Sequence, residues 1–462
     1  MTDLKEQFDA TTDVGFLNFM GSSLDGTEEV TATGLLNAYV PVFVVAFLVS
    51  ILITPLIRSL AVQGGVVDTP DEERKIHKFP IAYLGGLAVL GGICAALMYS
   101  YLVHPAVPST YSLVPIGVVL GMFAICFTGF MDDVWHWDPR LKIAGQLVAA
   151  AGLTLSGIGI NVAKGMLMPI FGPPDTVLLE FAGMVVEAGG LYYWLGTIIT
   201  AVFVIGGCNA TNLIDGLDGL LSGTAAIMAI GFLVISIIMA VGITDGDESN
   251  GIYYGARITL SFALLGAVLG FLPYNFNPAV IFLGDCGSLL IGYMCVVIIL
   301  LFGEMGETHL VVAGLIVFTL PIMDTLLAII RRKLSGLPMS APDDGHIHHM
   351  VLRSLGTVKR AVFTLYGLST IFMLLGILLA ALYTYKFVQG RVVYGVFLVL
   401  FSFISALAIK GARRGQWMRR KGAEEIPSTG DQAVEESSEP LLQAESHARP
   451  EDVDADSDPA AV

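Results

Sequence analysis

Long runs of apolar residues, broken by short polar segments, make up most of this chain. Windows of about 20 apolar residues are long enough to cross a bilayer as helices, and the pattern predicts eleven of them in series. So many exceed what the core of a soluble protein buries, and we expect an all-α polytopic membrane protein. The predicted spans cover residues 35–57, 82–104, 112–131, 141–160, 192–208, 220–242, 256–273, 287–303, 309–330, 361–385 and 392–410.

Charge is scarce in the spans and concentrated at the two ends of the chain. Only 14% of the 462 residues are charged, against about 25% in a typical soluble protein. Residues 1–32 hold seven acids and one Lys, and residues 423–462 hold twelve acids and one Arg, so the net charge of −16 belongs to these ends. The acidity therefore says nothing about a substrate, and we expect no nucleic-acid partner. The predicted parts are an acidic segment 1–34, a membrane domain 35–410, and a basic stretch with a disordered acidic tail at 411–462.

The Lys and Arg residues predict an orientation. Of the 24, and leaving aside Arg449 in the distal tail, 18 lie in the segments 58–81, 132–142, 209–219, 274–286, 331–360 and from 410 onward. Cytoplasmic loops carry such an excess, so we expect an inner-membrane protein with its amino end outside and its carboxyl end inside. The five cysteines show no CxxC spacing, so no disulfide framework or zinc site is indicated.

One outer segment is long enough for structure of its own. Residues 161–190 contain the β-type stretch Val177–Phe181 and are followed by Leu191–Trp194. We expect these two stretches to form a short hairpin.

Ionisable residues near membrane spans are costly and therefore informative. In this chain they collect at the ends of spans, on the predicted cytoplasmic side, rather than at mid-span. Asp132 and Asp133 follow an apolar run directly, ahead of Arg140 and Lys142. Adjacent carboxylates repel each other unless a cation offsets them. Asp is also a good helix cap, but a cap needs only one of the two, so the pair indicates a functional role.

The segment from Asn209 to Gly219 has the most specific pattern. Asn209, Asn212 and Asp215 are spaced three apart, which places them on one face if the segment is helical. Asp218 extends the row. Such a row of amide and carboxylate oxygens suits a hard cation or the donors of a nucleotide.

Two later loops add a carboxylate and a group of histidines. Asp285 lies between glycines at a predicted helix start, where it suits either a metal-binding or a capping role. Three histidines lie within four positions downstream of Arg332. They are His346, His348 and His349. Zinc is a rival interpretation, but spaced Cys or carboxylate partners are not evident. Beside basic residues, these histidines more naturally donate hydrogen bonds to phosphate.

Together these loops resemble those of the polyprenyl-phosphate N-acetylhexosamine-1-phosphate transferases. The family motif NAxNLxDGLDGL is present as Asn209–Leu220, and PAxxFxGDxGS as Pro278–Ser288. Within the family, the closer likeness is to the N-acetylglucosamine-1-phosphate branch. It rests on the runs Pro321-Ile-Met-Asp324-Thr325, Arg331-Arg332 and Ser340-Ala-Pro-Asp343…His346-Ile-His-His349, and the run Asp68-Thr-Pro…Arg74-Lys75…His77 also fits. The sequence departs from the family pattern at His136, where some members carry an acid, and at Asp344-Gly345, where many carry Lys-Ser.

The resemblance implies transfer of N-acetylglucosamine-1-phosphate, or a related sugar phosphate, from a UDP-N-acetylhexosamine to polyprenyl phosphate. UMP would leave, Mg²⁺ (or Mn²⁺) would be the cofactor, and helix ends would line a cytoplasmic-face groove. Such a reaction is the first membrane step of cell-envelope glycan synthesis. A homodimer is compatible with the resemblance, as is either direct attack or a covalent phospho-Asp intermediate.

The resemblance also assigns roles to residues. Asp285 is the expected metal ligand, with Asn212 and Asp215 supplying further oxygens, and Asp218 is assigned to the uracil ring. The residues expected in catalysis are Asp132, Asp133, Asp215, Lys142, His346, His348 and His349. Those expected to bind substrate are Asn209, Asp218, Arg332, Lys75, His77 and Asn275.

Two alternatives remain at this point. Within the same chemistry, the chain resembles the phospho-MurNAc-pentapeptide transferases of peptidoglycan synthesis, although these tend to carry an uninterrupted triple His. Outside it, a secondary transporter would show two related halves and polar residues at mid-span. The sequence has neither pattern.

Overall fold

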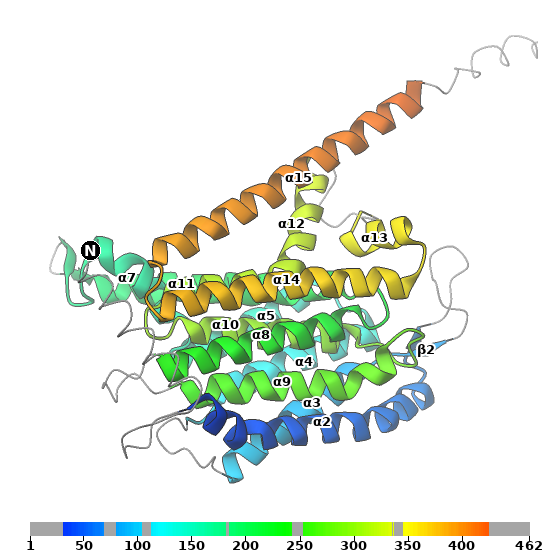
Figure 1. Cartoon of the computed structure of the whole chain (residues 1–462), viewed down its shortest axis with the longest axis horizontal. Coiled ribbons are helices and arrows are strands. Elements are labelled where there is room, and N and C mark those ends of the chain that lie inside the picture. Colours follow the sequence, from blue (N-terminus) through cyan, green and yellow to red (C-terminus); the bar gives the residue numbers. More distant parts are fainter. Residues whose placement is uncertain are drawn as a thin grey trace, which may run out of the picture. The chain divides into compact units, whose positions relative to one another are not determined.

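The computed structural model describes residues 31–68, 80–103, 112–181, 184–242, 253–334, 336 and 345–424. The chain divides into two units, Met1–Ala412 and Arg413–Val462, and the description below concerns the first. Its long helices run side by side (Figure 1). The helices are α2 Ala32–Gln63, α3 Gly85–Leu102, α4 Ile116–Trp135, α5 Pro139–Leu155, α6 Ile160–Phe171, α7 Ala188–Ile214, α8 Leu220–Gly242, α9 Tyr254–Asn275, α10 Gly284–Phe302, α11 Thr308–Val317, α12 Thr319–Leu334, α13 Ile347–Leu355, α14 Val358–Thr384 and α15 Gly390–Glu424.

The expected all-α polytopic membrane protein is confirmed. Among the described residues, nine helices are long and apolar enough to cross a membrane, and two bent helix pairs bring the number to eleven if each pair is one span. The bend is 66° between α5 and α6 and 77° between α11 and α12. The pair of α11 and α12 coincides with the predicted span 309–330, although the sequence did not reveal its bend. The predicted span 141–160 covers α5 but ends where α6 begins, so α6 lies in the segment 161–190 that was predicted to be outside.

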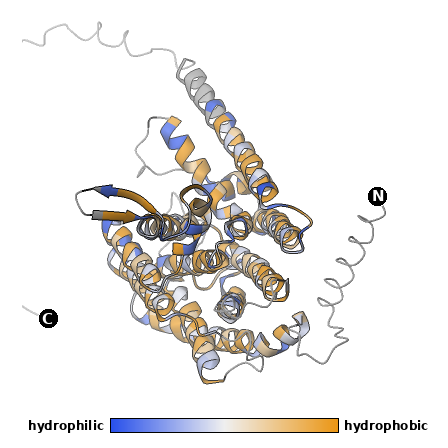
Figure 2. Cartoon of the chain, turned by 90° about the vertical axis from the view of Figure 1, so that its left-hand side faces the viewer, coloured by the Kyte–Doolittle hydropathy of each residue, from blue (hydrophilic) through white to orange (hydrophobic). Residues whose placement is uncertain are grey.

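The most buried helices are α8, α9 and α10, and the outer ones are α2 and α15. In α10, 94% of the apolar window is buried, against 22% in α2. The exposed apolar side chains of α2 recur every fourth residue, which is the signature of one helix face. They are Leu36, Val40, Val44, Leu48, Leu52, Leu56 and Leu60. Figure 2 shows hydrophobic residues on the outward faces of the helices, as a lipid environment requires.

Two loops far apart in sequence are joined by backbone pairing. Strand β1 (Val67–Asp68) pairs antiparallel with β2 (Ile81–Ala82), and Ala82 forms a parallel bridge with Ile281. The N–H of Phe282 donates to the carbonyl of Ala82 at 2.8 Å. The described ends of the first loop are therefore attached to the segment that leads into α10.

A hairpin is present in the outer segment, but its second strand is not the one predicted. Strand β3 (Val177–Phe181) pairs antiparallel with β4 (Met184–Glu187). The stretch Leu191–Trp194 lies in α7 instead. The nearer stretch can pair after a short connection, so the more distant one is left to join the helix.

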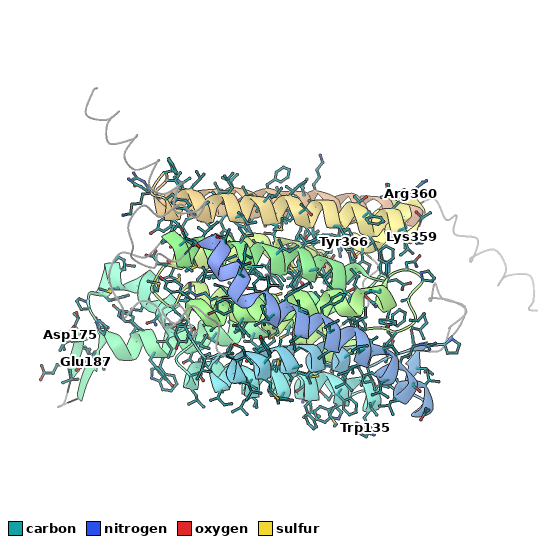
Figure 3. All side chains as sticks on the ribbon, turned by 60° about the horizontal axis from the view of Figure 1, so that its bottom comes forward. Trp135, Asp175, Glu187, Lys359, Arg360 and Tyr366 are labelled. Atoms are coloured by element: carbon teal, nitrogen blue, oxygen red, sulfur yellow. The ribbon has the colours of Figure 1, made fainter. Side chains whose placement is uncertain are left out.

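The two ends of the helical bundle differ in their residues. Trp135, Lys359 and Arg360 lie toward one end, and Asp175 and Glu187 lie at the other (Figure 3). The first end holds loops that were predicted to be cytoplasmic, and the second holds the predicted outer segment. The loops thus gather by predicted side, which places the polar motifs close together.

Candidate active site

Lys142 lies between two carboxylates that come from different helices. Its Nζ atom is 2.7 Å from Oδ2 of Asp132 and is also paired with Oδ2 of Asp285. Helix α5 begins at Pro139 behind Asp138, whose side chain accepts the N–H of Arg140, and this start sets Lys142 in the first turns. The side chains of Lys142, Asp132 and Asp285 are 25%, 15% and 23% exposed. The cluster is therefore within reach of a soluble substrate.

Asp133 has a different task from its neighbour Asp132. Its Oδ1 accepts the N–H of Asp285 at 2.7 Å and its Oδ2 accepts the N–H of Cys286 at 3.1 Å. These are orphan donors of the first turn of α10, so Asp133 caps a helix other than its own. Gly284, at φ +69°, leaves room for this carboxylate, which a Cβ atom there would overlap. One Asp of the pair caps a helix and the other binds Lys142.

The amide side chains of the third loop lie on a helix, which is the condition under which their spacing places them on one face. Helix α7 continues to Ile214, so it includes Asn209 and Asn212. Asn212 Nδ2 donates to Oδ1 of Asp285 at 2.8 Å and to Oγ of Ser288 at 2.9 Å. Asn209 Nδ2 donates to Oε1 of Gln146 at 3.0 Å. Asn212 therefore joins the Lys142–Asp285 cluster, while Asn209 contacts α5 one turn away.

The predicted row does not extend to Asp218. Because α7 ends at Ile214, Asp218 lies on the turn before α8 rather than on the helix face. Its Oδ2 accepts hydrogen bonds from Asn277 Nδ2 at 2.8 Å and from the N–H of Ala279 at 3.0 Å. This carboxylate ties the third loop to the fourth, and its assignment to uracil stays a prediction.

Asp215 is half-buried and makes no hydrogen bond or ion pair with another described residue. Burial, followed by the negative charges of Asp285, Asp133 and Asp218, raises its pKa to about 8. Lys142 is the cation paired with the cluster. Carboxylates thus outnumber the ammonium group, and a divalent cation with oxygen ligands would offset the excess.

A complete protein cage for a metal is not found among the described residues, where no three His, Cys, Asp or Glu side chains form one. Mg²⁺ does not require such a cage, because it binds through one or two carboxylates together with substrate phosphates. Asp285 fits that mode of binding. In Asn212, the Nδ2 atom donates the two hydrogen bonds described above, and the Oδ1 atom is the one that could bind a cation.

The histidine loop is anchored at the start of α13. His346 Nδ1 lies 2.8 Å from Oδ2 of Asp324, and the N–H of Ile347 donates to Oδ1 of the same carboxylate at 2.7 Å. The rings of His346 and His348 are nearly parallel, 12° apart, with centroids separated by 5.5 Å. The rings of His348 and His349 lie 4.3 Å apart.

His348 joins this loop to the third one. A Cβ atom at Gly216 would overlap the His348 ring, so the ring packs on the turn that directly follows Asp215. Burial, and then the charge of His349, lowers the pKa of His348 to about 4. His348 is therefore neutral near pH 7. The structure thus brings His348 against the turn that follows Asp215, a contact between two loops that the sequence could only suggest.

Comparison with known proteins gives this arrangement a family. Residues 115–303 match the model of glycosyl transferase family 4. The chain is 32% identical over 338 residues, 73% of this chain and 84% of the relative, to the probable undecaprenyl-phosphate N-acetylglucosaminyl 1-phosphate transferase of Bacillus subtilis. The chain belongs to glycosyl transferase family 4.

Two more members of family 4 support the assignment. The decaprenyl-phosphate N-acetylglucosaminephosphotransferase of Mycolicibacterium smegmatis is 33% identical over 70% of this chain and 77% of its own. The undecaprenyl-phosphate alpha-N-acetylglucosaminyl 1-phosphate transferase of Escherichia coli K12 is 31% identical over 79% of this chain and 89% of its own. The predicted family resemblance is confirmed.

Asp324 is a residue of this family 4 site to which the sequence analysis gave no role. It lies within the predicted span 309–330 and is 0% exposed, so the expectation that carboxylates avoid span interiors is wrong here. The signal was available, since an acid within an apolar run is costly unless it has partners. Its partners, His346 and Ile347, come from α13.

Of the predicted substrate-binding residues, Asn275 is held by hydrogen bonds outside the cluster. Asn275 is 3% exposed, with Oδ1 accepting from Ser222 Oγ at 2.7 Å and Nδ2 donating to the carbonyl of Ile281 at 3.1 Å. This placement supports a structural role better than substrate contact. Lys75 and His77 lie outside the described residues.

Arg332 remains a candidate for phosphate binding. It stands in the last turn of α12, whose carboxylate Asp324 holds the histidine loop. Its Nε is buried and has no hydrogen-bond partner among the described residues. A buried donor without a partner is costly, and an anionic ligand would satisfy it.

Proposed function

We propose that this family 4 protein transfers N-acetylglucosamine-1-phosphate from UDP-N-acetylglucosamine to a polyprenyl phosphate and releases UMP. The reaction forms a bond from a lipid phosphate oxygen to the sugar-bearing phosphorus and breaks the bond to the UMP oxygen. The names of the relatives support this sugar and this class of acceptor. The observation that carries the proposal is Lys142 held by Asp132 and Asp285 beside Asn212, at helix ends.

The location of the cluster suits the two substrates. A lipid acceptor stays in the bilayer and a nucleotide sugar stays in water, so they can meet only at the membrane surface. Charged groups at helix ends can be solvated or paired there, unlike at mid-span. With the Lys and Arg excess on the same side, we place the site at the cytoplasmic face of the inner membrane, in a groove between helix ends.

Positive groups and hydrogen-bond donors would hold the phosphates. Lys142 and Arg332 supply charge, and Arg can also bind two oxygens at once. His348 and His349 supply N–H donors from the loop that packs on Gly216, whereas His346, whose Nδ1 faces Asp324, would present Nε2 to a hydroxyl of the substrate as an acceptor. Electrostatic stabilisation of this kind is the main catalytic resource when several phosphate charges approach each other.

Asp285 would hold the metal ion, with Asn212 and Asp215 adding oxygens. When bound, Mg²⁺ would neutralise charge on the diphosphate and leave fewer negative charges for the acceptor to approach. Without it, the pKa of Asp215 is raised to about 8, first by burial and then by neighbouring carboxylates. That raised pKa supports a cation requirement at this cluster.

Asp132 is a better candidate for a base than Asp133. Both oxygens of Asp133 accept backbone N–H groups, whereas Asp132 is bound to a side chain, Lys142, that can move. The second pKa of a phosphate monoester is about 6, so the acceptor is mostly ionised at neutral pH. A base would therefore add little, and direct attack needs no covalent intermediate.

The test follows the sugar into the lipid phase. Purified protein receives polyprenyl phosphate and radiolabelled UDP-N-acetylglucosamine, and butanol-extractable label is measured with Mg²⁺ and with EDTA. We expect label only with metal, and its loss in Asp285→Asn. Glu304→Gln is the matched control, because Glu304 is a buried carboxylate that accepts two hydrogen bonds, from Gly159 N and Asn161 Nδ2, away from the cluster.

The outcomes separate the remaining alternatives. Transfer from UDP-MurNAc-pentapeptide or UDP-N-acetylgalactosamine, but not from UDP-N-acetylglucosamine, would keep the reaction and correct the sugar. Transfer that persists in EDTA would remove the metal from the proposal. Well-folded protein that transfers from no UDP-sugar would contradict the enzyme function as a whole.

A further inference from the structure

Asp324 is an acid with no exposure to solvent, placed inside an apolar helix. Its side chain is 0% exposed in α12. A buried carboxylate is strongly unfavourable unless it is paired and hydrogen-bonded. It has both kinds of partner here, since Oδ2 meets Nδ1 of His346 at 2.8 Å and Oδ1 accepts the N–H of Ile347 at 2.7 Å. Both partners belong to the first residues of the histidine loop.

The second of these bonds fixes the backbone. The N–H of Ile347 is one of the donors that the start of α13 leaves without an intrahelical acceptor. His346 is the N-cap residue of this helix, but its side chain makes no capping bond. Asp324 supplies the acceptor from a neighbouring helix, so that α13 starts at a set position relative to α12.

The first bond fixes the imidazole ring of His346. A carboxylate that accepts from Nδ1 requires the proton on that nitrogen, which leaves Nε2 without a proton, as the nitrogen that can accept a hydrogen bond or a proton from a ligand. The ring stacks on His348 with planes 12° apart, and His348 packs on Gly216 beside Asp215. The orientation of His346 is thereby linked to the ring nearest to the carboxylate cluster.

We propose that Asp324 is a positioning residue for sugar-phosphate transfer, which sets the tautomer and ring orientation of His346 and the start of α13. The catalytic role of the histidines in this inference rests on the proposed function. The contact between Asp324 and His346 does not depend on that function. Asp324 touches no substrate in this view. It acts through His346, as carboxylates do behind other functional histidines.

Asp324→Asn gives the sharpest test because Asn has the same shape. Its oxygen can still accept the N–H of Ile347, but its NH₂ group then faces Nδ1 of His346. That nitrogen must become an acceptor, so the proton moves to Nε2. ¹⁵N spectra of histidine-labelled protein report this change directly, and His346→Gln identifies the signal among the eight histidines. We expect the Nδ1–H form in the wild type and the Nε2–H form in the variant.

The kinetic expectation is a lower kcat, by roughly 10–100-fold, as for other residues that orient a functional histidine. KM for the UDP-sugar should change much less. The double variant Asp324→Asn/His346→Gln should be no slower than His346→Gln alone. Glu304→Gln, which also neutralises a buried carboxylate with two hydrogen bonds, should leave kcat and the histidine spectrum unchanged.

Several results would overturn the proposal. A wild-type His346 in the Nε2–H form would do so without any variant. The proposal would also fail if the reductions of kcat in the two single variants multiplied in the double variant. It would fail as well if Asp324→Asn switched the tautomer of His346 and left kcat unchanged. If the wild type transfers no sugar phosphate at all, the proposed function fails. The spectra still decide whether Asp324 sets His346, so the two failures are distinguishable.

Discussion

The carboxylate of Asp133 accepts the backbone N–H of Asp285 at 2.7 Å. It also accepts the next N–H, of Cys286, at 3.1 Å. A negative charge at the start of a helix is favourable, since it meets both the unpaired N–H groups and the positive end of the helix dipole. Asp133 therefore fixes the first turn of α10, and with it the side chain that we assign to the metal.

Replacing Asp133 with Ala should lower the transfer rate about 100-fold, because a displacement of about 1 Å at a reacting group causes losses of that size. Loss of the cap should also cost about 1 kcal/mol of stability. Asp133→Asn keeps one acceptor and should fall between Ala and the wild type. Initial rates and melting temperatures in detergent check this. A full rate in Asp133→Ala would show that Asp285 is held by other means.

Lys142→Met should also lower the rate about 100-fold, since it removes a positive group near the phosphates and leaves Asp132 and Asp285 without their ammonium partner. Lys142→Arg should recover part of the loss, because the charge returns in a planar group of different geometry. Lys359→Met removes one exposed positive charge from the same end of the bundle and serves as the control. Equal rates in the Met variants at positions 142 and 359 would contradict a specific role for Lys142.

Apolar length allowed much of the fold to be predicted from sequence. The predicted span 220–242 is α8 itself, Leu220–Gly242, because no charged residue interrupts it. The relationship of residues spaced three apart was also predictable, since Asn209 and Asn212 lie on the same helix, α7. The bends were not predicted, although the break between α5 and α6 falls at Gly157 and Gly159, which both have a positive φ, a conformation that glycine adopts most readily.

Pairings across helices could not be predicted at all. Asp132 and Asp133 are adjacent and chemically identical, yet one binds Lys142 and the other caps α10. Only the position of α10 separates these roles. Asp324 and His346 likewise come from different helices, and no spacing in the sequence connects them.

Gly216→Ala should disturb the histidine loop, because the new Cβ atom would overlap the His348 ring. The ring must move, α13 with it, and we expect the rate to fall about 10-fold or more. Gly367→Ala is the control, since no atom lies within 4 Å of a Cβ atom at that position of α14. In a helix that change should stabilise the protein by roughly 0.5–1 kcal/mol. Equal rates in both variants would argue against the contact.

Mg²⁺ should raise the melting temperature of the wild-type protein without any substrate, if the carboxylates bind it as proposed. Binding to the folded state alone stabilises by about 2.7 kcal/mol at 100 times the dissociation constant. Asp285→Asn should lose this response, and Glu304→Gln should keep it. A response that survives in Asp285→Asn would assign the ion to other ligands, and no response in the wild type would mean that the metal binds only with the UDP-sugar.

Acid should destabilise the protein partly through His348. Burial, and then the charge of His349, lowers the pKa of His348 to about 4, whereas the pKa of an unfolded His is about 6.5. Between these two pKa values the unfolded state binds a proton at this histidine and the folded state does not. The stability contributed by neutral His348 is therefore present above about pH 6.5 and is lost as the pH falls toward 4. His348→Gln does not titrate, and its melting temperature should fall less over this range. Melting curves of the two proteins from pH 8 to pH 4.5 that stay parallel would show that the pKa of His348 is the same in the folded and unfolded states.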